Sequence, residues 1–105
     1  MICAELLMRN GTLCGFDVHG HSGSAAAGND IVCAAVSSAV YLAANTLTEV
    51  CGCEASITQA DGKMRFVVDV ADVNKAQEVL KGLHIHLKGL VAQYPRFITI
   101  QLTEV

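Results

Sequence analysis

Two dipeptides, Asn10-Gly11 and Asp61-Gly62, constrain the fold of this 105-residue chain more than any other feature of its sequence. Each lies between two segments in which apolar and polar residues alternate, and a period of two is typical of strands that bury one face. Asn-Gly and Asp-Gly both favour the positive φ that a two-residue hairpin turn requires. The sequence therefore predicts two β-hairpins, one over residues 2–18 and one over residues 55–70.

Two further segments have the composition and spacing of helices. The first extends from about Asp30 to about Val50, is rich in alanine, and has Asn29-Asp30 as its candidate N-cap. Because this segment is apolar on most sides, we expect it to be largely buried. The second begins near Asp72 as a candidate cap, carries leucine and valine at helical spacing, and ends before Pro95.

A last strand, over residues 96–103, completes the order ββ-α-ββ-α-β. The composition includes fourteen alanines and nine glycines, so small side chains must fill much of the interior together with valine, leucine and isoleucine. A chain of this length buries roughly two-thirds of the surface that its unfolded form exposes, which is enough for one core. We therefore expect a single α+β domain over residues 1–105, with two helices packed on a largely antiparallel sheet.

Charge and hydropathy argue against two classes of partner. The net charge is −3 at pH 7 and the seven basic residues are scattered between Arg9 and Arg96, so we expect no direct contact with nucleic acid. The longest apolar stretch, residues 31–44, contains two serines and is shorter than the roughly 20 residues of a membrane helix. Because no charged-then-apolar leader opens the chain, we expect a cytoplasmic protein that does not bind membranes.

The five cysteines are an odd number, which favours reduced thiols over a disulfide framework. Cys3 and Cys14 lie on the strands of the first hairpin, where we expect them to pack or to face each other. Cys51 and Cys53 form a Cys-x-Cys pair without the further ligands that a structural zinc site requires, so we interpret them as structural or incidental thiols. Cys33 is the one candidate for chemistry.

Cys33 falls in the first turn of the predicted helix, twelve residues after His21. The free N–H groups and the positive dipole end of a helix start stabilise a thiolate there. A histidine brought alongside can act as general base and then as general acid, so the pair suffices for acyl transfer. The alternative is that Cys33 is a small core residue and Asp30 only a helix cap.

Two groups of residues could support this chemistry. Asp30 could orient the base or contact the substrate, and Ser37 lies four residues after Cys33 on the same helical face. The loop before the helix lacks bulky side chains, which suggests a mobile segment over the site. Its candidate substrate-loop residues are Gly20, Ser22, Gly23 and Gly28.

Gly20-His21, followed by the block GNDIVCAAVS from Gly28 to Ser37, resembles the signature of the ribosomal-processing cysteine proteases, the Prp family. The resemblance implies a small bacterial cysteine endopeptidase that is usually a homodimer and needs no cofactor or metal. Its implied substrate is the N-terminal extension of the large-subunit ribosomal protein L twenty-seven. It also implies that Cys33 is the nucleophile and His21 the general base, with Asp30 and Ser37 as supporting residues.

Two other functions remain compatible with the sequence. One is a non-catalytic binding module of ribosome assembly in which Cys33 is buried. The other is a metal-binding protein that uses His19, His21 and Cys33, because residues two apart on a strand point the same way. His84 and His86, in contrast, point about 160° apart on a helix and are expected to flank its apolar stripe.

Overall fold

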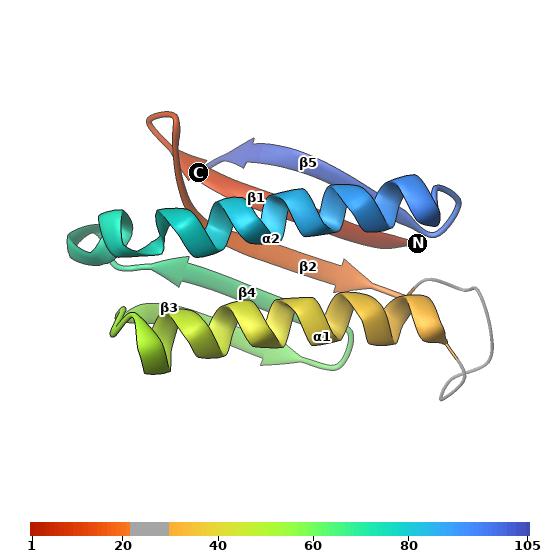
Figure 1. Ribbon diagram of the computed structural model, residues 1–105, viewed down its shortest axis with the longest axis horizontal. Coiled ribbons are helices and arrows are strands. Elements are labelled where there is room, and N and C mark those ends of the chain that lie inside the picture. Colours follow the sequence, from red (N-terminus) through yellow and green to blue (C-terminus); the bar gives the residue numbers. More distant parts are fainter. Residues whose placement is uncertain (22–29) are drawn as a thin grey trace.

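The computed structural model describes residues 1–21 and 30–105 and confirms the predicted order of strands and helices (Figure 1). Residues 22–29, which include the predicted loop residues Ser22, Gly23 and Gly28, lie outside the described part. The elements in chain order are β1 (Ile2–Arg9), β2 (Thr12–Gly20), α1 (Ile31–Asn45), β3 (Ala55–Ala60), β4 (Lys63–Val68), α2 (Val73–Gln93) and β5 (Ile98–Glu104).

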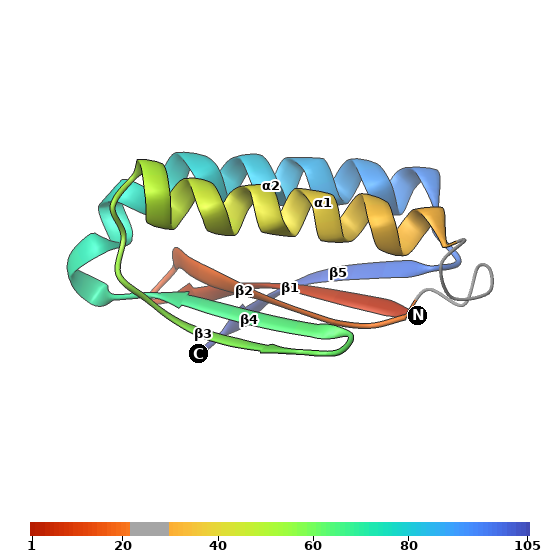
Figure 2. The same ribbon diagram turned by 90° about the horizontal axis from the view of Figure 1, so that it is seen from below.

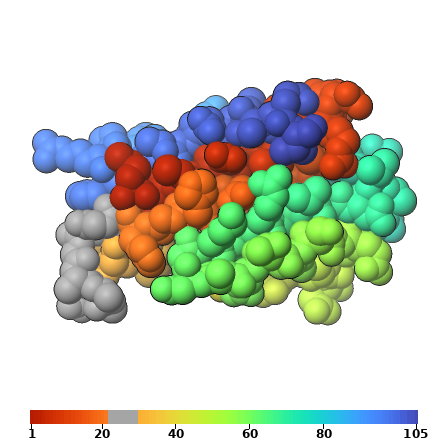
Figure 3. Space-filling view, turned by 180° about the vertical axis from the view of Figure 1, so that it is seen from behind, coloured from red at the N-terminus to blue at the C-terminus, as the bar shows by residue number. Residues whose placement is uncertain are grey.

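The five strands form one sheet in the order β3-β4-β2-β1-β5. All neighbouring pairs are antiparallel except β1 and β5, which are parallel because α2 returns the chain along the sheet before β5 begins. Both helices pack on the same face of this sheet (Figure 2). The view from behind shows the other face, where the strands lie side by side without a covering helix (Figure 3).

The two predicted hairpin turns are present but differ in backbone geometry. Asn10 and Gly11 both have positive φ, 54° and 77°, as a type I′ turn requires. In the second turn the only residue with positive φ is Gly62, at 68°. Both turns nonetheless connect antiparallel neighbours over two residues, as the sequence predicts.

The pairing of the first hairpin overturns one expectation. Cys3 pairs with His19 at the open end of the hairpin, whereas Cys14 lies on β2 close to the turn. Cys3 and Cys14 therefore do not face each other, because they lie at different distances from the turn. The register also shifts between Leu7 and Met8, so that Cys14 is an extra residue on β2.

The core fills the space between the sheet and the helices. At its centre the rings of Phe16 and Phe66, from the adjacent strands β2 and β4, stack with centroids 5.3 Å apart. Each such ring buries a large apolar area and adds a directional contact to it. The helices contribute the buried side chains of Val32, Val36, Val40, Leu47, Ala76, Leu80, Leu83 and Leu87.

α1 passes directly into a π-helical turn, Thr46–Val50, and the two form one apolar helix of 20 residues with a mean hydropathy of 1.6. By length and composition such a helix could cross a membrane, which the shorter stretch considered in the sequence did not indicate. Core helices of folded domains often share these properties. In this structure one side of α1, formed by Val32, Val36 and Val40, is buried against the sheet.

Asp72 does not act as the side-chain cap that the sequence suggested for α2. Its Oδ2 accepts a 2.8 Å hydrogen bond from the backbone N–H of Glu54, and its Oδ1 lies 3.2 Å from Nζ of Lys75. These contacts lower the pKa of the Asp72 carboxyl, the bond from Glu54 having the largest effect. Asp72 therefore joins the start of α2 to the segment that leads into β3.

Candidate active site

The end of β2, the start of α1 and the turn between β3 and β4 lie at the same end of the molecule (Figure 1). A cavity of about 510 Å³ lies between them, with α1 as one wall and the β2 end and the β3–β4 hairpin as the other. His21, Cys33 and Ser37 all line this cavity. Three of the four residues assigned to catalysis or its support from the sequence are thus brought together by the fold.

Cys33 is half-buried in the first turn of α1, and its place in that turn is fixed by Asp30. One carboxylate oxygen of Asp30 accepts hydrogen bonds from the backbone N–H groups of Val32 and Cys33, at 3.1 and 2.9 Å. Asp30 is therefore the N-cap of α1, as the sequence predicted. The cap bonds the backbone of Cys33 itself, so it positions the thiol as well as starting the helix.

The same contacts correct the expectation that the N–H groups of the helix start are free to stabilise a thiolate at Cys33. The N–H groups of Val32 and Cys33 instead donate to the Asp30 side chain, and that of Ala34 donates to the Asp30 carbonyl at 3.1 Å. These three donors are engaged within the protein.

His21 follows the last residue of β2, and Gly20 sets its position. Gly20 has φ of +97°, and a Cβ at that position would lie 2.3 Å from the carbonyl oxygen of Met1. Only glycine accommodates both the conformation and this approach. The N–H of Gly20 also donates to the carbonyl of Gly62 at 2.9 Å. Gly20 therefore belongs to the framework that carries His21 toward the β3–β4 turn.

Several residues that line the cavity, on α1 and on the β3–β4 hairpin, were not predicted from the sequence. Tyr41 lies two helical turns after Cys33, on the same side as Ser37, and its hydroxyl oxygen accepts a hydrogen bond from Nε2 of Gln59 on β3. Asp61 and Lys63, in and after the β3–β4 turn, line the cavity as well. The spacing 33, 37, 41 could have indicated Tyr41. The hairpin residues could not be found in the same way, since they meet α1 only through the tertiary fold.

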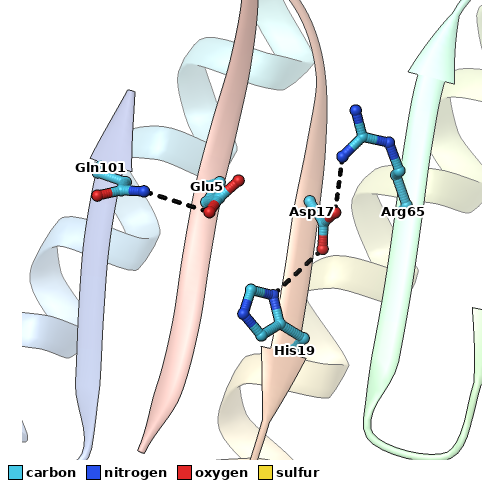
Figure 4. Close-up of polar contacts among 5 residues, drawn as sticks. All are labelled: Glu5, Asp17, His19, Arg65 and Gln101. Carbon is cyan, nitrogen blue, oxygen red and sulfur yellow. Dashed lines mark hydrogen bonds and ion pairs between the residues drawn. The ribbon is translucent and has the colours of Figure 1, made fainter. Parts of the chain in front are cut away.

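His19, two residues before His21, also lines the cavity, and its side chain contacts β2. Its Nδ1 lies 3.3 Å from one oxygen of the buried Asp17, and the other oxygen accepts a 2.7 Å hydrogen bond from Nη1 of Arg65 (Figure 4). Glu5 and Gln101 make a further polar pair nearby, at 3.2 Å. Within residues 1–21 and 30–105, no group of three or more His, Cys, Asp or Glu side chains is placed to hold a metal ion. The geometry therefore does not support the metal-binding alternative.

The other thiols are placed away from this chemistry. None of the five cysteines forms a disulfide, and Cys14 and Cys53 are buried. Burial raises the pKa of both of these thiols, which disfavours the reactive thiolate form. Of the five cysteines, all of which lie in the described part of the chain, Cys33 is the one that lines the cavity.

Solved structures with the same fold include a protease bound to peptides. The ribosomal processing protease Prp from Staphylococcus aureus, with a covalently linked product peptide, matches with a TM-score of 0.90 and 21% identity, over 98% of this chain and 100% of that one. The same protease with a substrate peptide matches with a TM-score of 0.84 and 20% identity, again over 98% and 100%. A protein from Streptococcus mutans matches with a TM-score of 0.79 and 29% identity, over 100% of this chain and 96% of that one. No curated protein matches the chain.

A family model described as cysteine protease Prp matches residues 1–99. The matched region contains the whole cavity, including the β2 end, the start of α1 and the β3–β4 turn. It also contains the Gly-His and the G-x-D-I-V-C block that carry the resemblance in the sequence. The chain therefore belongs to the Prp family of cysteine proteases.

Proposed function

We propose that this protein is an endopeptidase in which Sγ of Cys33 is the nucleophile and the imidazole of His21 is the general base. The observation that carries the proposal is that the two residues, from different parts of the chain, line one open cavity at the start of a helix. A thiol and an imidazole in one cleft are the minimum apparatus for acyl transfer. Membership of a cysteine protease family supports the same assignment.

The proposed reaction has two stages. His21 accepts the proton of the Cys33 thiol, Sγ attacks the peptide carbonyl carbon, and the C–N bond breaks as the imidazolium returns its proton to the leaving amine. Water then attacks the thioester, His21 takes a proton from it, and the C–S bond breaks. The N-terminal part of the substrate leaves as a carboxylic acid, and the thiol is restored.

Asp30 and Ser37 support this site in different ways. Asp30 acts through the hydrogen bond to the backbone N–H of Cys33, which makes it a positioning residue. Ser37 is exposed one turn after Cys33 and lines the same cavity, so its hydroxyl is available to a bound peptide.

We propose as substrate the N-terminal extension of the ribosomal protein L twenty-seven. The family resemblance supports this choice, and the S. aureus relative with this fold is a ribosomal processing protease whose structures hold a product peptide and a substrate peptide. The cavity agrees with such a substrate, because it is open to solvent and its volume of about 510 Å³ lies within the roughly 300–1,000 Å³ that is typical of ligand sites. A flexible chain terminus could enter it without the unfolding of a domain.

We propose further that the protein is a cytoplasmic homodimer. Five free thiols suit a reducing compartment. The outer side of α1 exposes apolar side chains, among them Leu42, and no charged residue occurs between Ile31 and Thr48. Exposed apolar surfaces of this kind are often buried between subunits. Sedimentation should give a dimer that Leu42→Glu dissociates and Ile85→Glu, at an equally exposed position on α2, does not; a monomeric wild-type protein would contradict the proposal.

The catalytic assignment is tested by cleavage of a peptide that spans the extension and the first residues of the mature L twenty-seven protein. We expect Cys33→Ser to abolish cleavage and His21→Ala to reduce kcat/KM by about 10² to 10⁴-fold. Matched controls are Cys51→Ser, a half-buried thiol outside the cavity, and His84→Ala on α2, both of which should cleave as the wild type does. Full activity of either Cys33→Ser or His21→Ala would refute the dyad.

A further inference from the structure

The turn between β3 and β4 contacts the imidazole of His21 through its glycine. A methyl group in the Cβ position of Gly62 would lie 2.8 Å from Nε2 of His21 and 3.1 Å from its Cε1. Ordinary van der Waals contact begins near 3.4 Å, so no side chain fits there unless the ring moves. The histidine ring therefore rests on the backbone of the turn.

The backbone of the same glycine also bonds the segment that carries His21. The carbonyl of Gly62 accepts the 2.9 Å hydrogen bond from the N–H of Gly20, the residue directly before His21. Turn and histidine are thus joined at two adjacent points, one through the main chain and one through the ring. A ring confined in this way loses less conformational freedom when it takes its place in a reaction.

Gly11, in the β1–β2 turn, serves as a comparison for Gly62, because no side chain such as that of His21 lies close to where its Cβ would be. Both glycines have a positive φ, +77° at Gly11 and +68° at Gly62, which disfavours any residue with a side chain. A Cβ at Gly11 would meet no atom within 4 Å. The two turns therefore impose the same backbone requirement, but a side chain at Gly62 would additionally displace His21.

We propose that Gly62 is a positioning residue of the active site. The backbone of the β3–β4 turn supports the His21 imidazole from one side and so fixes its position. The proposal depends on the assignment of His21 as the general base. Nε2 and Cε1 belong to the free end of a side chain, so the ring would yield before the backbone does. A side chain at position 62 should therefore change the reaction more than the stability of the fold.

The test compares Gly62→Ala with Gly11→Ala, and Gly62→Asn with Gly11→Asn. Asparagine tolerates positive φ, so the asparagine variants should fold even if the alanine variants are unstable. We expect the urea midpoints to shift equally within each pair, because the strain at positive φ is common to both positions. For the peptide cleavage, we expect the Gly62 variants to lower kcat by roughly ten- to hundredfold with KM unchanged, and the Gly11 variants to retain kcat.

A readout that does not depend on activity is the NMR signal of the His21 ring. We expect its Cε1–Hε1 cross-peak to move in Gly62→Asn and to stay in place in Gly11→Asn. Wild-type kcat and an unmoved His21 signal in Gly62→Asn would overturn the proposal. The outcome is separable from the proposed function, because an active His21→Ala variant refutes the dyad, whereas an inactive His21→Ala beside active Gly62 variants refutes only the role of the turn.

Discussion

At the scale of single residues, the carboxylate of Asp30 joins helix formation to the position of Cys33, the proposed nucleophile. One of its oxygens accepts hydrogen bonds from the backbone N–H groups of both Val32 and Cys33, so the contact that caps the helix also holds the backbone of Cys33. These hydrogen bonds are those of a helix cap, and they fix the backbone around Cys33. We interpret its contribution as geometric.

Substitutions at Asp30 distinguish a geometric role from an electrostatic one. Asparagine caps helices about as well as aspartate, so Asp30→Asn should retain both stability and most of the cleavage activity. Asp30→Ala should lose about 1 kcal/mol of stability and should cleave more slowly, because the backbone of Cys33 is no longer held. Urea unfolding and peptide cleavage measure the two effects. An Asp30→Asn variant that is stable and inactive would show that the charge itself takes part in the reaction.

The candidate site was predictable only as far as it is local in the sequence. Cys33 and Ser37 follow from helical spacing, and His21 from the motif that precedes the helix. Gly62 and Gln59 belong to a hairpin that reaches α1 through the tertiary fold, and the alternation of that hairpin gives no sign of the contact. The residue pattern therefore indicates Cys33 and His21, the proposed nucleophile and base, while the opposite wall of the cavity depends on the packing of distant elements.

At the scale of elements, the glycines show where the backbone is constrained. On β2, a Cβ at Gly15 would lie 1.9 Å from the carbonyl oxygen of Phe66 on the paired strand β4. On α2, Gly82 and Gly89 are exposed, and a Cβ at either would meet nothing within 4 Å. Glycine in a helix interior costs about 0.5–1 kcal/mol relative to alanine.

Alanine substitutions should therefore change the free energy of unfolding in opposite directions on α2 and on β2. We expect Gly82→Ala and Gly89→Ala each to raise the free energy of unfolding by about 0.5–1 kcal/mol. Gly15→Ala should lower it by about 3 kcal/mol or more, because the clash is with backbone that cannot move without breaking the sheet. Urea unfolding of the three variants measures this. Equal effects at positions 15 and 82 would contradict the packing described for β2 and β4.

The contacts of Asp72 with Glu54 and Lys75 make the stability of the fold depend on pH. The bond from Glu54 and the charge of Lys75 hold the pKa of Asp72 below its ordinary value, so this carboxylate stabilises the folded state above that value. The contribution should be complete near neutral pH and should be lost as the pH falls through the lowered pKa. The stability difference between wild type and Asp72→Asn should accordingly shrink between about pH 5 and about pH 2. A difference that is constant over this range would contradict the role of the charge.

At the scale of the whole molecule, local signals gave the elements and non-local contacts gave their arrangement. Turn dipeptides, helical spacing and Pro95 predicted every strand and both helices with small errors at their ends. The strand order β3-β4-β2-β1-β5 was not predictable from these signals, because it depends on pairing between strands far apart in the chain. This order places the β3–β4 turn beside the end of β2, and hence beside His21.

In the proposed reaction Cys33 is a nucleophile that His21 activates, and covalent labelling of the thiol is the sharpest test of this assignment. The reagent is a peptide of the L twenty-seven extension that ends in a chloromethyl ketone at the residue whose bond the enzyme cleaves. Digestion and mass spectrometry then locate the label among the five thiols. We predict one label, on Cys33, that excess substrate peptide prevents and that forms at least about tenfold more slowly in His21→Ala. Labelling of another cysteine, or an equal rate in His21→Ala, would contradict the account.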